Sequence, residues 1–141
     1  MSGMIFTSEE LAYLAAQPLG RLATLAPDGT LQNNPVSFEV NAEEGHIDIG
    51  GWNMGESRKF TNVRQNPEVS FVVDDIASLQ PWTVRGMEIR GRAEAVTGVP
   101  RGEGDFRSGE VIRIRPRRIR SWGVPDGEAG SARWTPVPGT R

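Results

Sequence analysis

The chain has 141 residues, of which 37% are hydrophobic, so it can form one domain around one modest core. Its formal net charge is −2, and its overall charge therefore does not indicate a polyanionic partner such as nucleic acid. Because the sequence contains no cysteine, disulfides, thiolate nucleophiles and cysteine-based metal sites are excluded.

The first residues do not resemble a targeting segment. Met1 to Thr7 contains no basic residue, and no long apolar run follows. No segment is apolar enough to cross a membrane. We therefore expect a cytoplasmic protein with no membrane partner. The 17 glycines and 10 prolines indicate many short elements joined by turns, which favours β structure.

The N-terminal half is predicted to contain one helix and three strands. Thr7 and Glu10 form a capping box for a helix that ends at Pro18. The strands that follow are predicted over residues 21–25, 31–40 and 47–49. Pro35 interrupts the second of these strands, which indicates a sheet edge, a bulge or a place where a ligand replaces strand pairing.

The C-terminal half is predicted to contain a second helix and three more strands. Ser57 caps this helix, which ends before Asn66 and Pro67. The strands are predicted over residues 69–73, 82–96 and 111–115, with loops at 74–81 and 97–109, the second of them mobile. Gly86 and Gly91 are expected to allow bends or bulges in the longest strand, as closure of a barrel requires.

These elements predict a mainly β fold with roughly six strands and two short helices, arranged as a small closed or split barrel. We expect residues 1–125 to form a single domain. Residues 126–141 are rich in proline, glycine and serine, and we expect them to form a poorly packed tail unless Trp134 docks it.

The clearest local signal for a ligand site is Ser57-Arg58-Lys59, at the start of the second helix. Lys59 is the only lysine of the chain. The N-terminus of a helix carries partial positive charge, so two cations in its first turn are unfavourable unless an anion binds there. Amide groups, a hydroxyl and two cations would then converge on one phosphate. The alternative is two solvated cations that Glu56 partly offsets.

Two other segments are candidates for contact with a flat ligand. Gly50 and Gly51 follow a strand and would let such a ligand approach the backbone, although a flexible turn is the favoured explanation of these two residues by themselves. Asn33 and Asn34 precede Pro35 inside a strand. Their amides can pair with the edge of a heterocycle, or they can be satisfied within a β-bulge.

Other chemistry is poorly supported by the sequence. His46 is the only histidine and follows a turn, so we expect it to be exposed and not catalytic. We identify no metal site and no catalytic residue, and a bound cofactor would have to carry any reaction. The run of arginines from Arg113 to Arg120 alternates with apolar residues and lacks aromatic residues for base stacking, which argues against a nucleic-acid partner.

The order of these motifs resembles the pyridoxamine 5′-phosphate oxidase-like flavin and deazaflavin oxidoreductases. The similarity is carried by the following segments: 21–25 with Asp28-Gly29, 34–38, Ser57-Arg58-Lys59 with Asn66-Pro67, and 85–93. The C-terminal segment 114–123, together with Trp82, looks more like the group that uses coenzyme F-420, a deazaflavin. True pyridoxamine phosphate oxidases have a substrate-binding C-terminal segment that this sequence lacks, which argues against vitamin B6 oxidation.

The resemblance implies a six-stranded split barrel that forms a homodimer with the cofactor at the subunit interface. Ser57, Arg58 and Lys59 would hold the cofactor phosphate. The ring system would be flanked by Asn34, Pro35 and Val36, and its edge would be lined by Ile49, Gly50 and Gly51. Residues of the long strand would reach over from the partner subunit: Trp82, Arg85 or Met87.

The sequence therefore predicts an F-420-dependent oxidoreductase that transfers a hydride to an unsaturated small organic substrate. An FMN-dependent flavoprotein of the same fold is the nearest alternative. A further alternative is a non-catalytic protein that binds or carries a flavin, a deazaflavin or heme.

Overall fold

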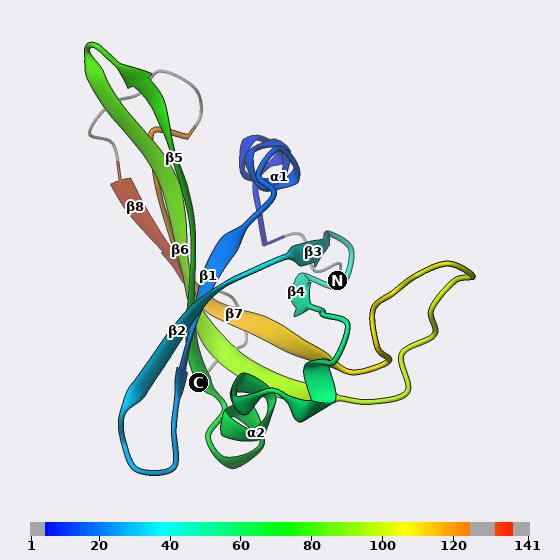
Figure 1. The fold of residues 1–141 in the computed structure, drawn as a ribbon. Helices are drawn as coiled ribbons and strands as arrows, with labels where there is room; N and C mark the ends of the chain where they lie inside the picture. Colours follow the sequence, from blue (N-terminus) through cyan, green and yellow to red (C-terminus); the bar gives the residue numbers. More distant parts are fainter. Residues whose placement is uncertain (1–4, 125–131, 137–141) are drawn as a thin grey trace.

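The computed structural model describes residues 5–124 and 132–136 (Figure 1). Its helices are α1 (Ser8–Ala15), α2 (Arg58–Gln65) and the short 3-10 helix η1 (Met54–Glu56). Its strands are β1 (Gly20–Leu25), β2 (Leu31–Val36), β3 (Phe38–Asn41), β4 (His46–Ile49), β5 (Glu68–Leu79), β6 (Trp82–Val96), β7 (Val111–Trp122) and β8 (Ala132–Pro136). The mainly β class and the two short α-helices agree with the sequence-based prediction.

All strands belong to one curled antiparallel sheet in the order β2-β1-β5-β6-β7-β4-β3, with β8 paired to β7. The two end strands of this path, β2 and β3, are separated along the chain only by Ser37. The sheet must therefore curl until its two ends meet at that residue. Phe38 on β3 packs edge-on against Phe71 on β5, with ring centroids 5.2 Å apart, and so joins the two halves across the interior.

The predicted number of six strands is wrong, because the sheet has eight strands. The predicted strand over 31–40 divides at Ser37 into β2 and β3. Pro116 does not end β7, which continues past it to Trp122. Within the predicted tail, the backbone of 132–136 pairs with β7, whereas 125–131 and 137–141 lie outside the described residues. Pro35 lies on β2, which is the first strand of the hydrogen-bonded path and therefore a sheet edge. A sheet edge is one of the three environments predicted for this proline, which has no N–H to donate.

The predicted loop over 74–81 is also wrong, since most of it is the second half of β5. Residues from Asp74 to Leu79 pair with the first residues of β6 and extend the hairpin to a turn at Gln80-Pro81. The reason is the length of β6, because its residues 82–85 lie beyond its pairing with β7 and would be unpaired without the second half of β5. Figure 1 shows this hairpin projecting from the body of the molecule.

Both α-helices begin as their sequences predict. The Thr7 hydroxyl accepts a hydrogen bond from the Glu10 N–H, and the Glu10 carboxylate accepts one from the Thr7 N–H, each at 3.0 Å. The Ser57 hydroxyl caps α2 by accepting from the Phe60 N–H at 3.3 Å. With eight residues each, neither helix is long enough to cross a membrane.

His46 is buried, with 6% of its surface exposed, contrary to the expectation of an exposed turn residue. It is the first residue of β4, which lies between β3 and β7, so its side chain is covered from both sides. Burial lowers the pKa of His46, and the nearby Asp48 carboxylate only partly opposes this effect. A neutral imidazole that packs inside the sheet is a structural group here.

Two glycines of β6 allow close packing where the sheet bends. The register between β6 and β7 shifts at Gly91, which lies opposite Pro116. A Cβ atom at Gly91 would collide with the backbone carbonyl oxygen of Arg115. At Gly86 a Cβ atom would lie 2.5 Å from the Trp122 ring. The bulge expected at Gly91 is therefore confirmed.

We expect the substitution Gly91→Ala to lower the free energy of unfolding by about 1–3 kcal/mol, because the added methyl group meets backbone that cannot rotate away. Chemical denaturation of the purified variant measures this loss. Gly102→Ala is the matched control, since a Cβ atom there has no other atom within 4 Å. Equal stability of the two variants would contradict the proposed close approach.

Candidate functional site

The N-terminus of α2 is held in place by Ser57. Its hydroxyl donates to the carbonyl oxygen of Met54 at 2.7 Å and also accepts from the Phe60 N–H. Its backbone N–H donates to the same carbonyl at 3.0 Å. No acidic residue lies in the first turn of the helix, which begins directly with Arg58 and Lys59. The positive end of the helix dipole and two cations therefore lie together.

Arg58 and Lys59 differ from the other basic side chains in residues 5–124. Each of the others has an ion pair, a hydrogen bond or an aromatic ring contact, whereas these two have none with any described residue. Two cations beside a helix dipole, with no carboxylate in direct contact, favour the binding of a negatively charged ligand.

The arginines of β7 are, in contrast, engaged within the sheet. Arg113 binds both carboxylate oxygens of Asp48, with its Nε 2.9 Å from Oδ1 and its Nη2 3.0 Å from Oδ2. Arg115 pairs with Glu94 at 3.3 Å, and Arg117 lies 3.5 Å from a Glu68 carboxylate oxygen. These side chains balance acids on neighbouring strands, so the arginine run has a structural explanation.

A cavity of about 260 Å³ lies beside Lys59, and we call it the Lys59 cavity. Its wall comes from the end of β2, from Ser37, from the turn after β4 and from the start of α2. The lining residues are Pro35, Val36, Ser37, Gly50, Gly51, Trp52, Asn53, Met54, Ser57 and Lys59. Six of the residues predicted to bind a cofactor therefore line one cavity, although they come from three separate segments of the sequence.

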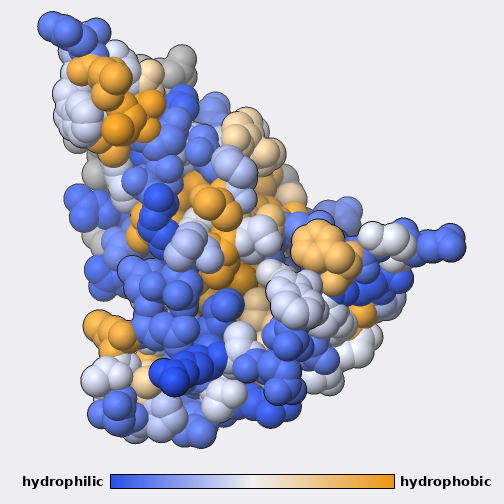
Figure 2. Space-filling model, in the orientation of Figure 1, coloured by the Kyte–Doolittle hydropathy of each residue, from blue (hydrophilic) through white to orange (hydrophobic). Residues whose placement is uncertain are grey.

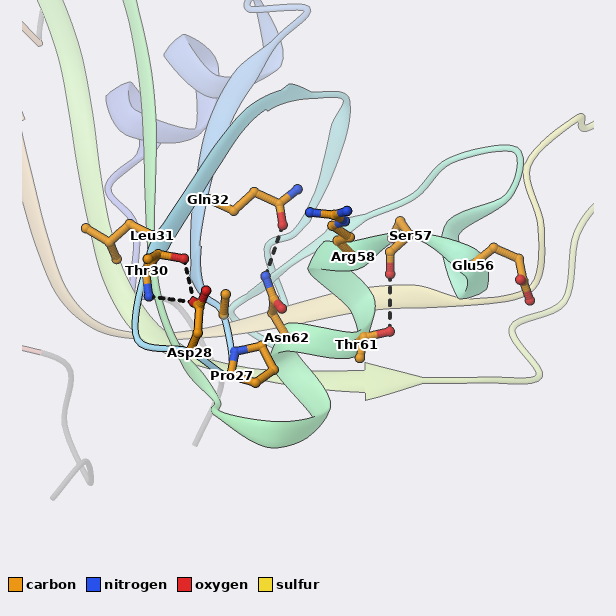
Figure 3. A pocket seen from close by; sticks show the side chains of 11 residues that line it. Pro27, Asp28, Thr30, Leu31, Gln32, Glu56, Ser57, Arg58, Thr61 and Asn62 are labelled. Atoms are coloured by element: carbon orange, nitrogen blue, oxygen red, sulfur yellow. Dashed lines mark hydrogen bonds between the residues drawn. The ribbon is translucent and has the colours of Figure 1, made fainter.

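A larger cavity of about 660 Å³ lies on the other side of Ser57, and we call it the Arg58 cavity (Figure 3). It is formed by the turn between β1 and β2 and by the first half of α2. Its lining residues are Ala26, Pro27, Asp28, Thr30, Leu31, Gln32, Glu56, Ser57, Arg58, Thr61 and Asn62. The sequence-based prediction included Ser57 and Arg58 but not this cavity.

A chain of amide side chains runs from α2 to the edge strand β2. The buried Asn62 donates to the Thr24 hydroxyl and to the Gln32 carbonyl oxygen, each at 3.0 Å. Gln32 in turn donates to the Asn34 carbonyl oxygen at 2.6 Å. This order leaves the Asn34 amide nitrogen free to donate to a ligand. Asn34 itself lines neither cavity but is held in one orientation.

The loop between β6 and β7 is fastened to the turn that carries Gly50 and Gly51. The Ser108 N–H donates to the Gly51 carbonyl oxygen at 2.9 Å, and the Ser108 hydroxyl accepts from the Met54 N–H at 3.1 Å. Arg107 pairs with Glu39 and Asp105 at 2.9 and 2.7 Å, which joins the loop to β3 as well. The predicted loop is present, and these contacts fasten part of it to the body of the protein.

Besides Asn34, four predicted site residues line neither of the two cavities. Ile49 is fully buried in the core, so only its backbone adjoins Gly50. Met87 is likewise fully buried, and a side chain in this position is not available to a cofactor held by another subunit. Trp82 is 64% exposed near the tip of the projecting hairpin. Arg85 pairs with Asp75, with its Nη2 2.6 Å from Oδ2.

Arg85 belongs to a separate polar cluster with Tyr13 and Asp75. The Tyr13 hydroxyl donates a hydrogen bond to the Asp75 carboxylate at 2.7 Å. The Arg85 guanidinium lies over the Tyr13 ring, 5.3 Å from its centroid. Burial and the hydrogen bond to Asp75 raise the pKa of Tyr13. The Arg85 side chain lowers the pKa of Asp75. This cluster fastens α1 to the β5–β6 hairpin.

Sequence reasoning missed Gln32, Asn62 and Ser108. Asn62 had a readable signal, because it lies between Phe60 and Val63 on the inward face of α2, where a polar residue requires a partner. Ser108 had none, since its partners are 54 and 57 residues away in the sequence. No cluster of three histidine, aspartate or glutamate side chains suitable for a metal ion occurs among the described residues.

Residues 6–123 match the family model described as pyridoxamine 5′-phosphate oxidase. Over 121 residues the chain is 48% identical to a 5a,11a-dehydrotetracycline/5a,11a-dehydrooxytetracycline reductase of Streptomyces rimosus, covering 86% of this chain and 85% of the reductase. A conserved hypothetical protein of Mycobacterium tuberculosis, Rv2991, is 26% identical over 92% of this chain and 95% of its own, with a TM-score of 0.64.

More distant solved structures share the fold. A heme binding protein of Mycobacterium smegmatis is 18% identical, covers 94% of this chain and 59% of its own, and has a TM-score of 0.66. A FAD-binding protein of Mesorhizobium loti is 20% identical, covers 82% of this chain and 93% of its own, and has a TM-score of 0.59. These similarities extend over most of the chain and not over one motif alone.

We expect Ser108→Ala to loosen the turn that carries Gly50 and Gly51, because the Met54 N–H loses its acceptor. Amide hydrogen exchange at Met54 should become roughly tenfold faster, which corresponds to about 1.4 kcal/mol. Ser78→Ala is the control. The Ser78 hydroxyl accepts a hydrogen bond from the nearby Gln80 N–H at the tip of the β5–β6 hairpin, away from Met54. Unchanged protection of Met54 would show that the loop does not hold this turn.

Proposed function

Because this chain belongs to the pyridoxamine 5′-phosphate oxidase family of oxidoreductases, we propose that it is a reductase that uses the deazaflavin coenzyme F-420. The reaction is hydride transfer to an unsaturated bond of a small organic substrate. The observation that carries the proposal is the pair of cations without an ion-pair partner, Arg58 and Lys59, at the N-terminus of α2, where Lys59 lines a cavity with a glycine wall.

The reaction type is supported by the Streptomyces rimosus relative. Its name describes a reductase of two dehydro compounds. A dehydro compound differs from its reduced form by two hydrogen atoms, which such an enzyme adds across an unsaturated bond. With 48% identity over most of both chains, the reaction type is the part of this name that we extend to the present protein.

The residues at the site fit a phosphorylated, flat cofactor. Ser57, Arg58 and Lys59 would hold its phosphate with a hydroxyl, two cations and the helix dipole. The ring system would lie along Gly50 and Gly51, where the absence of side chains permits close approach to the backbone. When bound, a reduced deazaflavin supplies a hydride.

The remaining parts of the wall would orient the cofactor. Pro35 and Val36 offer an apolar surface next to the ring, and Pro35 has no N–H that would require a partner. The Asn34 amide, held by Gln32, would donate to a carbonyl oxygen at the edge of the ring. Because the wall of the Lys59 cavity contains no carboxylate, imidazole or phenol, the protein's part is to bind and orient.

An FMN-dependent reductase is the second candidate, because the same phosphate site would accept FMN. A heme protein is less well supported. The only histidine, His46, is buried in the sheet and lines neither cavity, so it does not offer an axial ligand there.

We expect purified protein to bind F-420 with micromolar or better affinity and FMN more weakly. Binding is followed by cofactor fluorescence. Arg58→Ala and Lys59→Ala should each lower the affinity roughly tenfold or more, because a charged hydrogen bond contributes about 1.5–3 kcal/mol. The double variant should bind more weakly than either single variant.

Arg64→Ala is the matched control for this titration, since Arg64 lies at the other end of the same helix. It removes the same charge without changing the proposed phosphate site. FMN bound more tightly than F-420 would favour the second candidate. Tight binding without turnover of any electron acceptor would favour a carrier protein, and binding of neither cofactor would refute the proposal.

We also propose that the protein is a homodimer and that the β5–β6 hairpin contributes to the contact between the two subunits. Three large apolar side chains are exposed toward the end of the β5–β6 hairpin: Ile76 at 48%, Leu79 at 73% and Trp82 at 64%. Figure 2 shows hydrophobic atoms gathered at the tip of this projection. Exposed apolar surface of this kind is favourable to bury against another protein surface.

Light scattering of the purified protein should give twice the mass of 15.4 kDa. The double substitution Leu79→Ser with Trp82→Ser should shift the protein toward the monomer, because it removes exposed apolar area from the hairpin. Leu31→Ser is the control, since Leu31 is equally exposed, at 78%, but lies on a different strand. A wild-type monomer would contradict the proposed dimer.

A further inference from the structure

Trp52 lies in a turn that one residue of another loop closes. The Ser108 hydroxyl accepts a hydrogen bond from the Met54 N–H at 3.1 Å, and the Ser108 N–H donates to the Gly51 carbonyl oxygen at 2.9 Å. The backbone is therefore fixed on both sides of Trp52. The Trp52 side chain lines the Lys59 cavity, yet 73% of its surface is exposed.

Phe106 is presented in a similar way by the loop between β6 and β7. The Arg107 N–H donates to the Asp105 carboxylate at 3.0 Å, and the Arg107 guanidinium donates to the other oxygen of that carboxylate at 2.7 Å. The residues on either side of Phe106 are thus tied to each other, whereas Phe106 itself is 76% exposed. It lies close in sequence to Ser108, whose contacts fasten this loop to the Trp52 turn.

The fold does not explain why these two exposed residues are aromatic. Small polar residues and glycine are the usual residues of tight turns, and a turn closed by hydrogen bonds needs no aromatic ring. Each ring leaves a large apolar surface in water, which an apolar ligand covers favourably. Because Trp52 lines a cavity, a small molecule bound at that cavity can reach its ring.

We propose that Trp52 is the surface on which the substrate stacks, that Phe106 adds a second apolar contact from the neighbouring loop, and that the substrate is a flat, conjugated ring compound. We call these two residues the aromatic platform. This inference rests on the proposed function, which places the cofactor ring along Gly50 and Gly51. Gly51 directly precedes Trp52, so a substrate on this ring would adjoin the glycine wall of the cavity.

The chemistry of the platform favours a flat and neutral substrate. An indole ring has one large face, which makes most contact with a second flat ring and less with a branched aliphatic group. The charges next to Phe106 are already paired, since Arg107 binds Glu39 at 2.9 Å and Asp105 at 2.7 Å. The platform therefore selects for shape and conjugation more than for charge.

The test uses methyl ketones that share one conjugated C=C–C=O group and differ only in the substituent on its far carbon, which is methyl, tert-butyl, phenyl or naphthyl. The tert-butyl compound is apolar and bulky but has no flat face, so it separates shape from hydrophobicity. Dissociation constants are measured by equilibrium dialysis on protein saturated with oxidised F-420, so that no ketone is reduced. Each result is a ratio between two ketones on the same variant, which cancels any change in cofactor affinity.

We expect the naphthyl ketone to bind the wild type at least about fivefold more tightly than the tert-butyl ketone. Trp52→Ser should remove this preference, whereas Trp52→Phe, which keeps a flat ring, should retain part of it. Leu19→Ser is the matched control and should keep the wild-type ratio, because Leu19 is an exposed apolar residue, at 49%, that lines neither cavity. Equal binding of the two ketones to the wild type would overturn the inference, and so would an unchanged preference in Trp52→Ser.

Phe106→Ser provides a second test at a residue that lines neither cavity. It should lower the preference for the naphthyl ketone about twofold, because one of the two aromatic contacts is lost. An unchanged preference would show that the two residues do not act on one ligand and would overturn the platform.

Two further measurements separate the alternatives. A shift of Trp52→Ser to a lower mass in light scattering would show that a second copy of the chain covers this ring, which would also overturn the inference. Absence of F-420 binding to the wild type, followed by cofactor fluorescence, would refute the proposed function. Binding of F-420 without a preference for flat ketones would overturn the inference alone.

Discussion

The closure of the sheet at Ser37 is the constraint on which the rest of the site depends. The hydrogen-bonded path of strands begins with β2 and ends with β3, and these two strands are joined by one residue. A sheet with this order has to curl back on itself. The end of β2 is thereby brought next to the turn after β4, and the Lys59 cavity lies at this junction. The Lys59 cavity is thus a product of strand order.

The charge pattern separates cations that pair with acids from two cations that do not. Arginines on the long strands pair with acids on the neighbouring strands, such as Arg113 with Asp48 and Arg92 with Glu68. Arg58 and Lys59 lie instead at the N-terminus of α2, where the backbone itself is positive, without an acid in contact. A fold that provides contacts for its other described basic groups and leaves these two unpaired concentrates its unpaired positive charge at the N-terminus of α2.

Local features of the fold were predictable from the sequence, and features set by length or by distant contacts were not. The capping box of α1, the Ser57 cap and the edge position of Pro35 depend on residues a few positions apart. Ser57-Arg58-Lys59 could be selected because two cations in the first turn of a helix violate a local preference. The second half of β5 was missed because only its partner β6 requires it. Ser108 was missed because its hydrogen-bond partners are more than 50 residues away in the sequence. The burial of Met87 and His46 was also missed, because it depends on which strands become neighbours.

The strand order also has a kinetic consequence. The pairings of β1 with β5 and of β4 with β7 join segments that are far apart in the sequence. Contacts of this kind form slowly, because a long chain loses entropy before they contribute any stability. The junction at Ser37 exists only once both pairings are complete, so partly folded chains lack the cavity. Capture of a cofactor would then act only on molecules that have finished folding, and would trap them in that state.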